Sequence, residues 1–189
     1  MKIKLILIII FVTAFILRVQ FLPKNVLTFG YDQARDAIQV QNILEGDIKI
    51  LGPSASTPGM HHGVFYYYFL TPAYFFGKGS PVAAAYWVAF FNSLVVFIVY
   101  LIAKILIGKP GAGVISAFLY AISFEASQYA TWLSNPTIGA WTVPLMYLGL
   151  LFWTKERKLF IGPLLAALGL GLSIHANIFL LYQFPSQIP

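Results

Sequence analysis

Four of the six acidic residues of this chain lie in one segment, residues 29–63. Within it, Asp32 and Asp36 are four residues apart and Arg35 lies between them, so one turn of helix would present two carboxylates and a guanidinium to water. Asp32 has two interpretations: an N-cap of that helix, or a general base that takes a proton from an acceptor hydroxyl. Arg35 and Asp36 have a simpler interpretation as an exposed ion pair that adds little stability.

The same segment contains the adjacent histidines His61 and His62. Neighbouring side chains diverge on most backbones, so the pair alone is a weak metal site. One of them could bind a metal or a phosphate with help from Asp32, Glu45 or His175. The alternative is that both make only polar contacts within a loop.

Further candidates lie outside this segment. Arg18, near the end of an apolar run, either reaches toward lipid headgroups or binds a lipid-linked phosphate through its bidentate geometry. Trp132 and Asn135 suit sugar recognition, but a membrane-interface Trp and a turn Asn would look the same. The run that begins at Tyr66 reads as an aromatic belt, and Glu125 has no visible partner.

Composition assigns the chain to a broad class. Of its 189 residues 59% are hydrophobic and only 10% are charged, and the mean hydropathy is +0.80. These values predict a polytopic membrane protein, and long unbroken apolar runs favour helices over a barrel. The net charge of +6 comes mostly from isolated basic residues, so nucleic-acid binding is not expected. The absence of cysteine fits an extracytoplasmic site.

We therefore expect an all-α fold with about five transmembrane helices. The first apolar run is not followed by a small-residue cleavage site, which favours a retained span over a signal peptide. An outer loop, residues 23–80, separates the first two spans. The predicted spans cover residues 5–22, 81–107, 112–129, 137–153 and 159–181.

Basic residues predict the orientation. Lys2 and Lys4, Lys104 and Lys109, and the cluster 155–158 fall on one side if every segment crosses once, which marks that side as cytoplasmic. The chain is then a multi-pass protein of the cell membrane. Its N-terminus is cytoplasmic, and the outer loop is extracytoplasmic. Within this loop we expect a helix that Asp32 caps and that ends at Leu44, lying on the membrane surface. A second juxtamembrane helix is expected over residues 64–76.

Several motifs, taken in order, resemble one family. Leu17–Arg18 closes the first span, and Tyr31 opens the loop motif Tyr31–Asp32–Gln33–Ala34–Arg35–Asp36. The block 61–68 (HHGVFYYY) and the turn 132–136 (WLSNP) follow. Together they look like the N-terminal portion of a GT-C glycosyltransferase. The resemblance is to the branch with the family 39 protein mannosyltransferases and the aminoarabinose transferases of lipid A, and it covers nearly the whole chain, to about Leu181. It implies that residues 1–189 are one module, the N-terminal part of such a transferase.

The resemblance implies an inverting transferase that moves a sugar from a polyprenyl phosphate to a protein, lipid or glycan acceptor on the outer face of the membrane. Asp32 would be the catalytic base, and the residues expected to bind substrate are Arg18, Tyr31, Arg35, Asp36, His61, His62, Tyr66, Trp132, Asn135 and His175. No cofactor is implied beyond a divalent metal, which the residues leave open. Relatives often carry an acid where this chain has Gln33, so no role is assigned there.

Two other classes stay open. The chain could be a carrier or scaffold that binds a lipid-linked sugar without catalysis. It could also be an inactive piece of a longer transferase, since the family core has about seven spans and this chain turns abruptly polar over residues 182–189.

Overall fold

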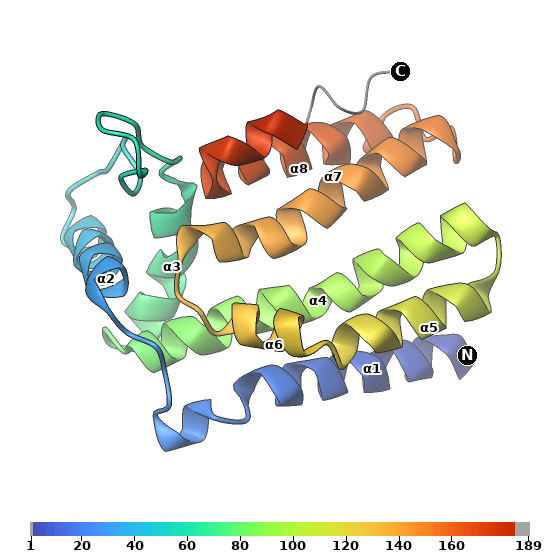
Figure 1. The fold of residues 1–189 in the computed structure, drawn as a ribbon, viewed down its shortest axis with the longest axis horizontal. Helices are drawn as coiled ribbons and strands as arrows, with labels where there is room; N and C mark the ends of the chain where they lie inside the picture. The colour runs from blue at the N-terminus through green and yellow to red at the C-terminus, as the bar shows by residue number, and fades with distance from the viewer. Residues whose placement is uncertain (1, 184–189) are drawn as a thin grey trace.

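The computed structural model describes residues 2–183, and within that range it contains helices and connecting segments but no strand (Figure 1). The all-helical expectation is confirmed. Most of the polar terminal segment, residues 184–189, lies outside the described part. The elements in order are α1 (Lys2–Val19), η1 (Leu22–Lys24), α2 (Tyr31–Leu44), α3 (Phe65–Phe76), α4 (Pro81–Ile107), α5 (Pro110–Ala121), α6 (Phe124–Ala130), η2 (Asn135–Ile138), α7 (Gly139–Thr154), α8 (Ile161–Ala176) and η3 (Ile178–Gln183).

Three helical segments of the described chain are long and apolar enough to cross a membrane: Lys2–Lys24, Pro81–Ile107 and Asn135–Thr154. They correspond to the first, second and fourth predicted spans. Two further apolar helices are shorter, with 12 residues in α5 and 16 in α8. At 1.5 Å per residue these reach roughly 18 and 24 Å. Both fall short of a hydrocarbon core of about 30 Å.

The third predicted span, residues 112–129, is not one helix. It breaks after Ala121, and Ser123 starts a new helix by accepting a hydrogen bond from the amide of Ala126. The guanidinium of Arg18 donates to the carbonyls of Tyr120 and Ala121. The Ser123 cap therefore explains the interruption, and the Arg18 guanidinium binds carbonyls at the end of α5.

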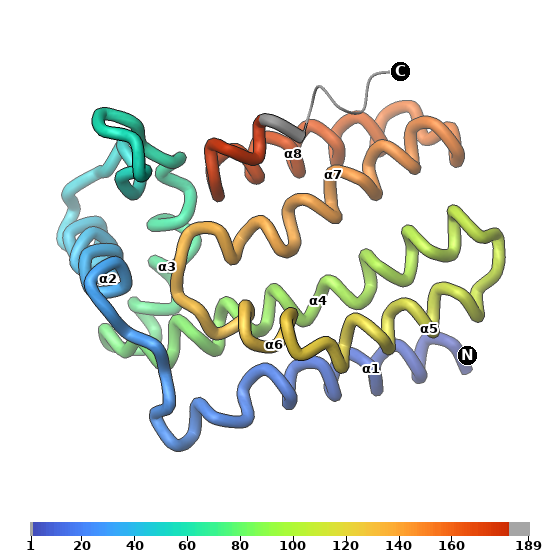
Figure 2. The backbone as a smooth tube through the Cα atoms, in the orientation of Figure 1, coloured from blue at the N-terminus to red at the C-terminus, as the bar shows by residue number. Residues whose placement is uncertain are grey.

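The long helices α1, α4, α5, α7 and α8 run roughly alongside one another, and the turns between them lie at the two ends of the molecule. Figure 2 shows α7 beside α8, and α1 beside α4 and α5, in agreement with their packing contacts. The N-terminus, the α4–α5 turn and the α7–α8 turn lie at one end, while α2 and α3 lie at the other (Figure 1). The basic clusters used to predict the cytoplasmic side thus gather at one end of the molecule.

Local sequence explains how the longest helix begins and ends. Ser80 caps α4 through its side-chain oxygen, and Pro81 occupies the first helical position, where no amide is needed. At the other end Gly108 adopts a φ of 74°, which a residue without Cβ tolerates best. Pro110 then opens α5, so the chain reverses within a few residues.

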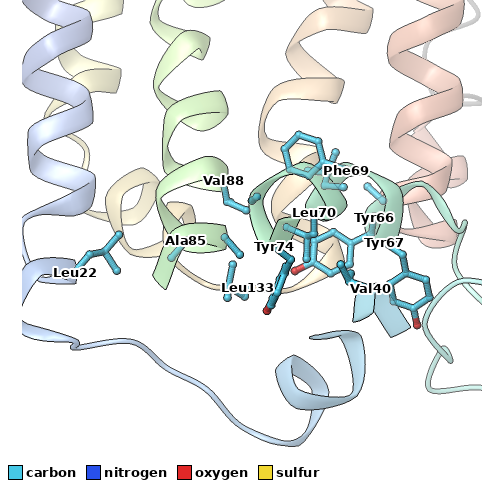
Figure 3. Close-up of a cluster of buried hydrophobic side chains, with 14 residues drawn as sticks. Leu22, Val40, Tyr66, Tyr67, Phe69, Leu70, Tyr74, Ala85, Val88 and Leu133 are labelled. Carbon is cyan, nitrogen blue, oxygen red and sulfur yellow. The ribbon is translucent and has the colours of Figure 1, made fainter. Parts of the chain in front are cut away.

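Two clusters of buried apolar side chains hold the helices together. One joins α1, α4 and α5, where the rings of Phe11 and Phe97 stack with centroids 5.6 Å apart. The other lies at the α2–α3 end and combines side chains from α3 and α4 with Leu22, Val40 and Leu133 (Figure 3). Through Val40, the second cluster joins helix α2 of the outer loop to α3 and α4.

Candidate functional site

Helix α2 begins two residues earlier than expected, and Asp32 is not its cap. Gly30 is the N-cap residue, and its amide donates to Oε1 of Gln33 at 2.9 Å. Gly30 has no side chain to cap the helix. The contact from Gln33 to the Gly30 amide supplies one half of a capping box instead. Asp32 lies in the first turn, where the positive end of the helix dipole favours a carboxylate.

The buried face of α2 differs from the one expected. Gln33, Asp36 and Val40 are buried, at spacings of three and four residues, whereas Ile38 is 59% exposed. The expectation that Asp36 faces water together with Asp32 is wrong. Asp36 points inward because the helix is rotated so that Val40 can join the apolar cluster beneath it.

Arg35 connects an exposed carboxylate to a buried one. Its Nε and Nη2 atoms donate to Oδ1 of Asp36 at 2.9 and 2.8 Å, and its Nη1 atom donates to Oδ1 of Asp32 at 2.9 Å. The Asp36 side chain is 3% exposed and that of Asp32 is 65% exposed. Asp36 thus orients Arg35, and Arg35 holds Asp32 at the water-facing edge.

The environment of Asp36 is unusual for a carboxylate. Its Oδ2 atom is buried and has no hydrogen-bond partner among the described residues, and the same is true of the Tyr66 hydroxyl. Burial raises the pKa of Asp36 to about 6, although the hydrogen bonds and charge of Arg35 lower it. A neutral carboxyl is therefore accessible to this side chain near physiological pH.

Three tyrosines of α3 are affected by the same carboxylate. Burial first, and then the charge of Asp36, raises the pKa of Tyr67 and of Tyr74 to about 12, and that of Tyr66 well above its ordinary value. Figure 3 shows the hydroxyl ends of Tyr67 and Tyr74 directed out of the apolar cluster, to the side on which α2 lies. These hydroxyls stay protonated and can act as donors.

A cavity of about 360 Å³ adjoins this charge cluster. Arg35 and Gln39 contribute from α2, Tyr67 from α3, and Lys49 and His61 from the loop between these helices. Backbone and side-chain atoms of residues 48–52 and Ser54 complete the lining. The lining includes two cations and a histidine but no carboxylate. Each cation is already paired with a carboxylate outside the lining, and each keeps further N–H donors that a ligand in the cavity can use.

Residues 48–51 line this cavity and form no strand. Their position is set by Tyr68, whose hydroxyl donates to the Lys49 carbonyl at 2.8 Å and accepts from the Lys49 amide at 3.1 Å. The Lys49 ammonium also pairs with Asp47. The second loop helix, expected over residues 64–76, is confirmed as α3.

The two histidines have different roles. Nδ1 of His61 lies 3.0 Å from the Gly52 carbonyl, which can only accept, so this nitrogen carries a proton. Nδ1 of His62 instead accepts from the Ile178 amide at 3.2 Å. Burial, followed by the charges of Arg35 and His61, lowers the pKa of His62. His61 lines the cavity, whereas His62 fastens the loop to η3.

Arg18 lies apart from this cavity. It is 2% exposed, and it donates to the carbonyls of Ala14, Ala121 and Tyr120 at 2.9, 3.3 and 3.5 Å. Its guanidinium also lies over the Tyr120 ring, 5.1 Å from the centroid. Arg18 lines a separate cavity of about 440 Å³ near the end of α1 and α6. The structure therefore does not bring Arg18 into the cavity beside Arg35.

The remaining candidates are dispersed. Tyr31 is 84% exposed at the start of α2, and Tyr66 is fully buried in the apolar cluster. Asn135 is buried and donates to the Ala176 carbonyl. His175 is exposed, and its carbonyl accepts from the Gly63 amide at 3.1 Å. Asn135 and His175 thus join the turn before α7 and the outer loop, respectively, to the end of α8.

Among residues 2–183 no group of three or more acidic, cysteine or histidine side chains is placed to hold a metal ion. The nearest approach to such a set is the pair Asp32 and Asp36, and Arg35 already neutralises one oxygen of each. These residues do not fit a divalent cation, so no catalytic step is assigned to one.

Reasoning from the sequence missed Gln39, Lys49 and Tyr67 as lining residues. A usable signal existed for α2: Gln33, Asp36, Ala37, Val40 and Leu44 repeat at the spacing of one helix face, which would have placed Asp36 inward. No local pattern could have brought Lys49 to Arg35, because the intervening loop has no periodicity.

Comparisons of the chain with protein-family models, with curated proteins and with solved structures find no match.

Proposed function

We propose that this chain is a membrane-bound inverting glycosyltransferase of the GT-C type, which moves a sugar from a polyprenyl phosphate to an acceptor hydroxyl on the extracytoplasmic side. One observation carries the proposal. An exposed carboxylate, Asp32, is oriented by Arg35, which is itself anchored on the buried Asp36 and lines the cavity together with Lys49.

The proposed membrane placement has five crossings, with α5 and α8 spanning together with the three longer segments. The N-terminus, the α4–α5 turn and the α7–α8 turn lie at one end and carry the basic clusters, which is the pattern of a cytoplasmic face. The loop with α2 and α3 then faces the outside. The shortness of α5 and α8 is accommodated by local thinning of the bilayer.

The proposed step is a single displacement. Asp32 accepts the proton of the acceptor hydroxyl while that oxygen forms its bond to the anomeric carbon of the sugar. The bond from the anomeric carbon to the phosphate oxygen breaks, and the polyprenyl phosphate leaves with the electron pair. Arg35 and Lys49 line the cavity and offset the negative charge on the leaving phosphate.

Asp36 acts through Arg35 rather than on substrate. Its carboxylate is buried and accepts two of the guanidinium hydrogen bonds, which fixes the plane of that group. The third observed bond then aims Nη1 at Asp32. The apolar cluster that includes Val40 and Leu70 lies beneath Asp36, whose side chain is 3% exposed.

Replacing Asp32 with Asn tests the proposal. Purified protein in lipid nanodiscs is supplied with a series of undecaprenyl-phosphate-linked hexoses, and both sugar transfer and donor binding are measured. An Asn cannot accept the proton, so transfer should fall by about 100-fold or more, while donor binding stays unchanged. Glu45→Gln is the matched control, because Glu45 is exposed at the other end of the same helix. Its transfer rate should equal that of the unchanged protein.

A carrier gives a different result. Donor binding without transfer in either the unchanged protein or the Asp32→Asn variant would reject the enzymatic proposal and favour a lipid-linked sugar carrier. Full transfer by the Asp32→Asn variant would keep the transferase but remove Asp32 as its base.

A further inference from the structure

A second cavity, of about 260 Å³, lies over the short helix α6. It is lined by Glu125, Gln128, Tyr129 and Trp132, together with Thr28 from the segment that leads into α2. None of these residues lines the cavity beside Arg35. Glu125, Gln128 and Tyr129 lie at i, i+3 and i+4 on one face of α6, and Trp132 follows just after the end of that helix.

Two aromatic rings form one side of this cavity. The centroids of Tyr129 and Trp132 are 5.6 Å apart and the ring planes meet at 79°, an edge-to-face pair. In such a contact one ring contributes its edge and the other contributes one face, so the remaining ring faces are not used by the pair. Tyr129 is 37% exposed and Trp132 is 42% exposed. A flat apolar patch of ligand can therefore lie on these rings.

Three polar side chains form the other side, and their hydrogen-bonding capacity is unused. Glu125, Gln128 and Thr28 are exposed. Among the described residues no side-chain hydrogen bond or ion pair involves any of the three. A carboxylate accepts, an amide both donates and accepts, and a hydroxyl does both. This set matches a ligand that carries several hydroxyl groups.

We propose that this cavity binds one ring of an acceptor saccharide, an inference that rests on the proposed transferase function. The C–H face of a pyranose is apolar and stacks on an aromatic ring, while its edge carries hydroxyls for Glu125 and Gln128. At about 260 Å³ the cavity lies just below the range of roughly 300–1,000 Å³ typical of drug-sized ligands, which suits a single ring. Ammonium cages rely on several aromatic faces, whereas polar groups are the majority here.

The surroundings explain why the acceptor would bind at this place. Thr28 and Gln128 also line the cavity of about 440 Å³ at the end of α1, so the two spaces adjoin and a second sugar unit has room to continue. Thr28 precedes the proposed base Asp32 by four residues. A saccharide held against Thr28 therefore lies beside the segment that leads to the catalytic helix.

Fluorine NMR on protein labelled with 5-fluorotryptophan tests the site. The chain has four tryptophans, and Trp132→Phe assigns the resonance of interest. Methyl glycosides of glucose, mannose, galactose and N-acetylglucosamine are titrated one at a time in nanodiscs without any donor. At least one should shift the Trp132 resonance with a Kd of about 1–10 mM, and the other three resonances should stay in place.

Variants separate this inference from the proposed function. Glu125→Gln should weaken glycoside binding about tenfold through loss of a charged hydrogen-bond acceptor. Glu156→Gln, an exposed glutamate in the α7–α8 turn, should bind as the unchanged protein does. Asp32→Asn should lose transfer and keep the Trp132 shift. If transfer is never detected while the shift persists, the saccharide site stands and the transferase proposal fails.

Two results would overturn the inference. One is the absence of any Trp132 shift with all four glycosides up to about 100 mM, a tenfold excess over the weakest Kd expected. The other is a shift produced by tetramethylammonium and by none of the glycosides, which would identify the cavity as a site for an ammonium headgroup.

Discussion

The α7–α8 hairpin and the α2–α3 pair are both made of two neighbouring helices, yet they are held together by different means. In the hairpin the helices touch backbone to backbone. A Cβ added at Gly149 or Gly169 would collide with the main chain of Ala166 or Met146. The buried polar contact there is neutral, with Ser173 donating to Thr142 at 2.9 Å.

In the α2–α3 pair the contact includes a charge. Asp36 is buried against the tyrosines of α3, and within residues 2–183 one of its oxygens has no partner and its only ion pair is with Arg35 of the same helix. Burying a carboxylate costs free energy that close packing does not. The α7–α8 hairpin is thus stabilised by close packing. In α2, burial of Asp36 lowers stability but fixes the Arg35 guanidinium beside the exposed Asp32.

The largest effect should come from breaking the charge pair. Arg35→Leu leaves Asp36 buried without its partner. At pH 8 this carboxyl must either stay charged in an apolar site or take up a proton, so the free energy of unfolding should fall by about 3–5 kcal/mol. The loss should shrink toward pH 5, where Asp36 takes up a proton. Thermal unfolding in detergent, followed by circular dichroism, measures it. Arg157→Leu, in the exposed α7–α8 turn, is the control. Equal effects of the two variants would contradict the buried pair.

The pH dependence of stability should show the cost of Asp36 directly. Its pKa is about 6 in the folded chain against 3.8 ordinarily, so the folded state binds more protons between these values. Stability is then greatest below pH 4 and falls as pH rises through 6, by on the order of 3 kcal/mol at about 1.4 kcal/mol per unit. Thermal unfolding across pH 4–7 checks this, and Asp36→Asn should remove that part of the slope. If the slope is unchanged in Asp36→Asn, another titrating group causes the pH dependence.

Added side-chain volume at the α7–α8 contact should destabilise the fold, but by less free energy than loss of the charge pair. Gly169→Val places new atoms against the backbone at Met146, and such overpacking costs about 1–3 kcal/mol. Gly171, two residues along the same helix, has open space around it, so Gly171→Val should cost less than Gly169→Val. The difference in melting temperature between the two variants is the measurement. Equal melting temperatures would argue against the tight α7–α8 contact.

The smallest effect on stability is expected at Asp32. Its side chain is 65% exposed, and an exposed ion pair contributes about 0–1 kcal/mol. Asp32→Asn should therefore leave the melting temperature nearly unchanged even though it is the variant expected to abolish transfer. A large drop in melting temperature would make Asp32 a structural residue instead.

Much of the helix layout followed from local pattern. The apolar runs located α1, α4 and α7, Pro81 and Gly108 marked the ends of α4, and the aromatic run located α3. The failures have a different origin. The interruption at Ser123 depends on a side-chain cap, and the guanidinium that binds the carbonyls there belongs to Arg18, which comes from more than one hundred residues earlier in the chain. Hydropathy averages over a window and does not register either.

The sequence alone determined that the chain is helical and apolar, and that its acids gather in one loop, because composition and periodicity act over a few turns. Tertiary structure decided which of those acids is buried and which cations share a cavity. Packing of Val40 against α3 and α4 sets the rotation of α2, and with it the inward direction of Asp36 and the outward direction of Asp32. The loop that brings Lys49 and His61 to Arg35 has no repeating pattern, so its path depends on contacts such as those of Tyr68 with the Lys49 backbone.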